Sequence, residues 1–153
     1  MKDRSKARID NIRARFGARI AAAEAGQRDD RSVFLDAFAT TRDQVLAPVL
    51  FEIGEELAQD GSRFAVERSE SPLPSISLRL FLTSLRPSGH VVSFTVIDRG
   101  RGLEVLVWLE ASPPPMDLAR YQPAALTRDV VEQIVVDAVE QIFACVAELG
   151  TGG

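Results

Sequence analysis

The chain has one histidine and one cysteine, and these two side chains bound the catalytic chemistry available to it. His90 stands at the head of a predicted strand, beside a proline-glycine turn. A hydrolytic triad needs a nucleophile, this base and an orienting acid that converge in space, and the spacing around His90 indicates no such partners. Cys145 falls on the apolar face of a predicted helix, where a thiol behaves as a small hydrophobic residue. We therefore predict no catalytic residue and no enzyme activity.

Carboxylates and arginines form two further patterns that suggest binding chemistry. Glu52, Glu55, Glu56 and Asp60 lie on adjacent turns of one predicted helix, but oxygen-ligated cations are usually gathered by a loop. We interpret these residues as a solvated helix face. The run Asp-Arg-Gly-Arg-Gly at 98–102 lacks the following helix and lysine of a phosphate-binding loop, so we interpret it as a hairpin turn. The sequence predicts no metal and no cofactor.

The strongest pattern is a basic amphipathic helix predicted at residues 3–25. The first 20 residues carry seven basic and two acidic side chains, a balance of +5, so the rest of this chain of net charge −4 carries −9. Apolar residues recur at helical spacing in a stripe as narrow as a coiled-coil seam, and they are Ile9, Ile12, Phe16, Ile20 and Ala23. The partner-binding residues that we predict from this pattern are Ile9, Ile12, Phe16, Arg8, Arg15 and Arg19.

A basic border around an apolar stripe suits an anionic membrane surface, a nucleic acid or an acidic protein surface. The stripe has few large apolar residues for a membrane, and no aromatic platform accompanies it for a nucleic acid. Two interpretations remain open, which are packing on the chain's own body and association with a protein partner or a second copy. The polar run 26–30 is predicted to end the helix and to act as a hinge.

The elements that follow are predicted from a change of period. A second helix at about 30–60 is interrupted by Pro48, which kinks it or begins a new helix. The period then changes from 3.6 to 2, which predicts strands at 63–68, 75–83, 91–98 and 103–110. Residues 111–126 contain four prolines and are predicted to be a strap loop. A closing helix begins after Thr127, its predicted N-cap.

These elements predict one α+β domain over residues 1–153, with N-terminal helices, a four-stranded antiparallel meander sheet and a long C-terminal helix packed on the sheet. Residues 1–26 are predicted to include the amphipathic helix and to be able to protrude from this domain. No run approaches the roughly 20 apolar residues of a membrane span, and no apolar signal segment opens the chain. We expect a cytoplasmic protein, and its acidic total argues against general nucleic-acid affinity.

The function that we expect is that of a non-catalytic protein-interaction or assembly module, homo-oligomeric or a subunit of a larger complex. It depends on two surplus apolar surfaces, the N-terminal stripe and a second sheet face that is also apolar. The alternative is a small-ligand-binding regulatory domain, with a pocket between the sheet and the C-terminal helix. The residues predicted to line that pocket are Arg79, Phe81, Phe94 and Trp108.

Overall fold

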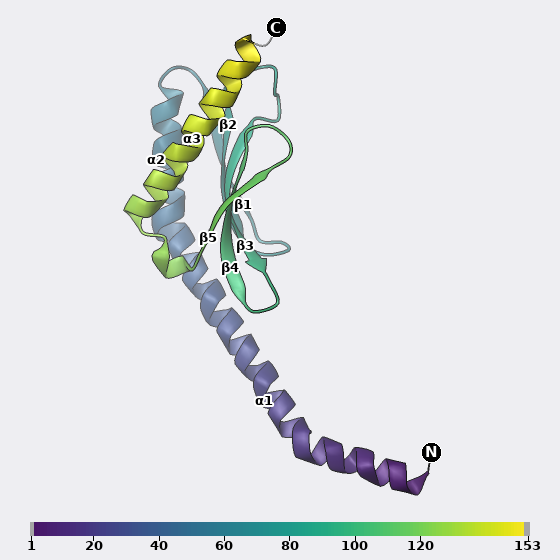
Figure 1. Cartoon of the computed structure of the whole chain (residues 1–153). Coiled ribbons are helices and arrows are strands. Elements are labelled where there is room, and N and C mark those ends of the chain that lie inside the picture. Colours follow the sequence, from purple (N-terminus) through teal and green to yellow (C-terminus); the bar gives the residue numbers. More distant parts are fainter. Residues whose placement is uncertain (1, 152–153) are drawn as a thin grey trace.

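The protein begins with one long helical rod that leaves the body of the molecule and bends towards its N-terminal end (Figure 1). A computed structural model describes residues 2–151, and the side chains of residues 2–148. Helix α1 spans Asp3–Thr41, a π-helical turn η1 spans Arg42–Leu46, and α2 spans Ala47–Ala58. The predicted break at 26–30 is wrong, because α1 continues through these residues. A single glycine costs a helix only about 1 kcal/mol, and the polar side chains around it are solvated.

Pro48 explains the π-helical turn. Proline has no N–H to donate and its ring presses on the carbonyl four residues earlier, so the α-helical bonding pattern cannot pass through it unchanged. The rod widens to i→i+5 bonding just before this point, where the Ala47 N–H donates to the Arg42 carbonyl. Pro48 then lies in the first turn of α2, as one of the two predicted alternatives had it. The chain leaves α2 at Gly61, whose φ of 95° suits only glycine.

Five antiparallel strands follow in the order of the chain and form an open meander sheet. Strand β1 spans Arg63–Ser69, β2 Ser75–Phe81, β3 His90–Asp98, β4 Leu103–Glu110 and β5 Met116–Tyr121. The first four confirm the predicted alternation to within two residues at each end. The register pairs Ile76 with Phe94, and Phe94 with Val107, so the apolar positions of neighbouring strands share one face.

The prediction of four strands is wrong, because β5 lies within the segment predicted as a strap loop. Three of its four prolines precede the strand and Pro123 follows it, and only Ala111–Pro115 separates β5 from β4. A bulge between Val107 and Trp108 shifts the pairing of β5 on β4, so β5 has no clean period of two. Leu118 and Tyr121 pack on the core, and the short η2 turn at Pro123–Ala125 returns the chain to the helices.

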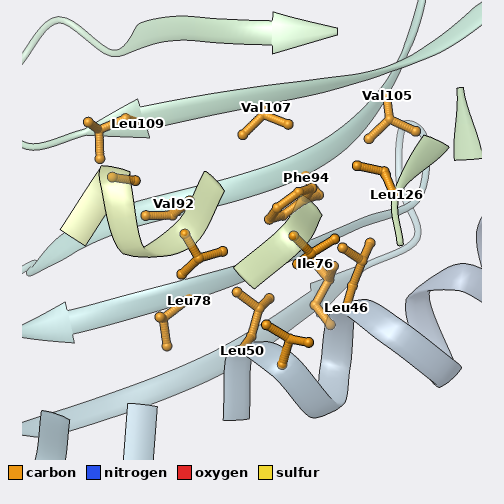
Figure 2. Close-up of a cluster of buried hydrophobic side chains, with 14 of the residues drawn as sticks. Leu46, Leu50, Ile76, Leu78, Val92, Phe94, Val105, Val107, Leu109 and Leu126 are labelled. Atoms are coloured by element: carbon orange, nitrogen blue, oxygen red, sulfur yellow. The ribbon is translucent and has the colours of Figure 1, made fainter. Parts of the chain in front are cut away.

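Helices α2 and α3 cover one face of the sheet (Figure 1). Helix α3 spans Arg128–Thr151, and Thr127 caps it by accepting a hydrogen bond from the Val130 N–H, as predicted. Side chains of the helical layer and the sheet interdigitate in a closed core (Figure 2). The residues labelled there are Leu46, Leu50, Ile76, Leu78, Val92, Phe94, Val105, Val107, Leu109 and Leu126, all of them buried.

The opposite face of the sheet carries a line of hydroxyl groups instead of a helix. Ser77 Oγ donates to Ser93 Oγ over 2.8 Å, and Ser93 Oγ lies 2.8 Å from Thr95 Oγ1. Trp108 Nε1 donates to the same Thr95 oxygen over 3.0 Å. The polar groups at the centre of this face are thus partnered with one another.

Candidate functional site

The projecting half of α1, defined as residues 2–24, is the most unusual surface of the protein. Every one of these residues is exposed, and Figure 1 shows the segment directed away from the sheet. Its apolar stripe consists of four large side chains with 39–60% of their surface open to solvent, namely Ile9, Ile12, Phe16 and Ile20. The predicted partner-binding residues Ile9, Ile12 and Phe16 therefore lie together on one helix side and outside the core of their own domain.

Basic side chains border this stripe without ionic partners. Arg8, Arg15 and Arg19 follow each other at helical spacing, and the Arg15 guanidinium lies 5.1 Å from the centroid of the Phe16 ring. Within the described residues, none of these three arginines has a carboxylate within 4.0 Å. The stripe and its border thus offer an apolar centre, about three to four turns long, beside positive charge.

The root of α1 anchors the helix on the body of the protein. Phe38 is fully buried in the core, and Phe34 and Leu35 pack against that core. Arg31 Nη1 contacts Asp98 Oδ2 over 2.7 Å and so joins α1 to the β3–β4 hairpin. Because the helix runs unbroken from this root, residues 2–24 cannot fold back onto their own body while they remain helical.

A groove of about 690 Å³ lies beside this root. It is formed by α1 between residues 27 and 37, by the hairpin residues 98–103 and by residues 122–124. The Arg31–Asp98 pair lies in it, and Val33 is 70% exposed along it. The Gly100 N–H donates to Asp98 Oδ1 over 2.9 Å. This hydrogen bond, followed by the one from Arg31, lowers the pKa of Asp98.

The sequence gives no sign of this groove, because its two walls are 67 residues apart in the chain. The run at 98–102 is the hairpin turn that we predicted, with Gly100 and Gly102 at positive φ. Only the position of α1 above the turn makes it one wall of a groove.

The structure does not gather the four predicted pocket residues. Phe94 is fully buried on the helix-covered face of the sheet. The alternation of strand residues directs Arg79, Phe81 and Trp108 to the opposite face. Arg79 contacts Glu67 across the strand pair, with Nε 2.7 Å from Oε1.

His90 and Cys145 lie apart from both surfaces. His90 is fully buried, and its Nδ1 lies 2.7 Å from the carbonyl oxygen of Ala111, while Nε2 has no hydrogen-bond partner. Burial is the main cause that lowers the pKa of His90. Cys145 is half-buried on α3. Among the described residues, no group of three or more His, Cys, Asp and Glu side chains is arranged to hold a metal ion.

Of the four carboxylates predicted on one helix, Glu52, Glu55 and Glu56 lie exposed on α2, and Asp60 lies in the turn that follows it. Glu52 pairs with Arg128 at the start of α3, and Asp60 accepts a hydrogen bond from the Ser62 N–H. Hydrogen bonds from Ser62 are the main cause that lowers the pKa of Asp60. These contacts tie α2 to α3 and to the following turn.

In the described part of the chain, no helix has the length and apolar character needed to cross a membrane. Comparisons with models of protein families, with curated protein sequences and with solved structures find no match to this chain.

Proposed function

We propose that this protein is a non-catalytic assembly module that associates through the projecting half of α1. The observation that supports it is the exposure of Ile9, Ile12, Phe16 and Ile20 on a helix that does not pack on its own domain. Helices in proteins are stabilised mainly by packing of their apolar side, and contiguous exposed apolar surface is typical of interaction sites. A partner that covers this stripe supplies the contacts that the body of the protein does not.

A pair of charge substitutions on the full-length chain tests this function. Ile12→Asp with Phe16→Asp places two carboxylates in the stripe, and Ala14→Asp with Ala18→Asp places two on the far side of the same helix. Both pairs are exposed in the single chain, so neither is expected to change its stability by more than about 0.5 kcal/mol. We expect light scattering after size exclusion to show a smaller assembly only for the first pair.

Two results would count against an assembly function. One is an intact chain that is monomeric and recovers no partner from its source. The other is an equal loss of assembly in the Ala14/Ala18 variant, which would indicate a general effect of charge on the helix. Deletion of residues 2–24 is a second test of assembly through this segment. It removes no side chain of the buried core, so the rest of the domain is expected to stay folded.

The alternative, a ligand-binding regulatory domain, is favoured by one observation, the groove beside Arg31 and Asp98. Its volume of about 690 Å³ lies within the range of small-molecule sites, although its position differs from the pocket that we predicted. A library of small metabolites tested by thermal denaturation checks this function. A ligand of the groove raises the melting temperature of the intact protein and loses that effect in Val33→Glu, whose exposed side chain lines the groove.

A further inference from the structure

The exposed side of α3 carries a stripe whose character is opposite to that of α1. Glu132, Val136, Glu140 and Phe143 follow each other at spacings of 4, 4 and 3, which places them on one side of the helix. We call these four residues the acidic stripe. Val136 is 50% and Phe143 42% exposed, although a helix packed on a sheet usually keeps such residues on its covered side. Within the described residues, no cation lies within 4.0 Å of Glu132 or Glu140.

The two stripes match each other in length and in charge. Ile9 to Ile20 and Glu132 to Phe143 each span eleven helical steps, about 17 Å along the axis. The first has apolar residues bordered by arginines, and the second has apolar residues alternating with glutamates. The net charge of the whole chain is distributed in the same way, since residues 1–20 carry +5 and the remaining residues carry −9. Opposite charges around an apolar centre favour a defined pairing of two surfaces.

The acidic stripe of the same chain is out of reach of the projecting half. Helix α1 is continuous from Asp3 to Thr41 and is anchored by Phe38 in the core, and its first half points away from α3 (Figure 1). The partner surface must therefore belong to another molecule. Pairing of two α1 helices with each other is disfavoured, because each brings seven basic and only two acidic residues in its first 20.

We propose that the projecting half of α1 docks on the acidic stripe of α3 in a second copy of this chain. The exchange is reciprocal, so that two equal contacts form around a twofold axis and the dimer is closed. Ile12 and Phe16 then lie against Val136 and Phe143, while Arg8, Arg15 and Arg19 face Glu132 and Glu140. This inference rests on the assembly function proposed above and names its partner.

A charge exchange on the full-length chain tests the pairing. One variant carries Arg8→Glu, Arg15→Glu and Arg19→Glu, a second carries Glu132→Arg and Glu140→Arg, and a third carries all five changes. We expect the dimer dissociation constant to rise at least about 100-fold in each of the first two, because like charges then meet in both contacts. The third variant restores opposite charges in both contacts and is expected to dimerise again.

A matched control reverses two other exposed carboxylates. Asp36→Arg with Glu55→Arg makes the same change in net charge outside the acidic stripe, and it is expected to leave the dissociation constant within about threefold of the original. Sedimentation equilibrium provides the constant for each variant, and circular dichroism checks that the helices and the sheet are retained.

Three results overturn the proposed docking, and they separate it from the assembly function. If Glu132→Arg with Glu140→Arg dimerises as the intact chain does, while Ile12→Asp with Phe16→Asp dissociates it, the docking surface is wrong and assembly through α1 stands. If the variant with all five substitutions stays monomeric, as the two partial variants do, the two stripes do not contact each other. If the intact chain is monomeric at about 200 µM, no second copy binds, and assembly through α1 then requires a different protein.

Discussion

Acidification below pH 6.5 is expected to destabilise the protein through one side chain, His90. The imidazole is fully buried, and the 2.7 Å contact between Nδ1 and the Ala111 carbonyl identifies Nδ1 as the protonated nitrogen. Nε2 is enclosed without a partner. A second proton would therefore add a charge and an unpaired N–H at Nε2 inside the protein, which is unfavourable. Burial accordingly lowers the pKa of His90 below its ordinary value of 6.5.

The sign and size of the effect follow from the difference between the folded and unfolded states. The pKa is lower in the folded state, so the unfolded chain binds the proton more readily. The stabilising contribution is complete above pH 6.5 and is lost as the pH falls below it. The free energy of unfolding therefore decreases between pH 7.5 and pH 5 by at most about 2 kcal/mol, the limit for one group that is protonated only in the unfolded chain, with a slope of at most about 1.4 kcal/mol per pH unit.

The assay is urea denaturation at pH 7.5, 6.5, 5.5 and 5.0, on the intact chain and on His90→Asn. The asparagine amide can donate near the position of Nδ1 and does not titrate in this range. Asp60 and Asp98, whose pKa values are lowered from 3.8, titrate below the window. The free energy of unfolding of the intact chain minus that of His90→Asn should therefore decrease as the pH falls from 7.5 to 5. A signed difference that stays constant or increases towards pH 5 would refute the reasoning.

Two other substitutions test the packing of the domain. Gly54→Ala would place a methyl group 2.3 Å from Cδ2 of Phe64, and we expect a net loss of up to about 2 kcal/mol, since overpacking outweighs the helix propensity gained. Thermal denaturation of Gly54→Ala with Phe64→Leu, where the ring is absent, should recover part of this loss. Thr95→Val removes the acceptor of Trp108 Nε1, so we expect a loss of about 1–2 kcal/mol and a changed tryptophan emission. Thr95→Ser retains the hydroxyl and should preserve both stability and emission; equal losses in the two variants would show that the methyl group matters instead.

Alternation of apolar residues was sufficient to predict four strands, because each has one face buried against helices. It failed for β5, where the bulge opposite Val107 removes the period of two. The continuity of α1 through residues 26–30 was harder to predict. Gly26 is a local signal for the end of a helix, whereas the residues around it are solvated and tolerate a helical backbone. The interruption of the helix at Pro48 was easier to predict, since a missing backbone N–H changes the hydrogen bonding of any helix that contains it.

The projecting half of α1 could be predicted as a surface because its residues are neighbours in one helix. Pockets are different, since they depend on how strands pair. The pairing of Phe94 with Val107 directs Trp108 away from Phe94, and this register depends on the turn between β3 and β4 together with the burial of one face of both strands. The contact of Arg31 with Asp98 depends on the direction of a helix that begins far from the hairpin in sequence, so no local pattern contains it.

The open sheet has a further consequence for how copies of this protein meet. Its edge strands, β1 and β5, leave backbone N–H and C=O groups unpaired, and such edges can join one molecule to the next in growing aggregates. Exposed charges lie along both edges, at Arg63, Glu67 and Arg68 in β1 and at Asp117 and Arg120 in β5. A second strand added at either edge would bring these charges together and strip them of water. Strand-to-strand aggregation is thus disfavoured on both sides, so the open sheet can remain uncovered at its edges without joining molecule to molecule.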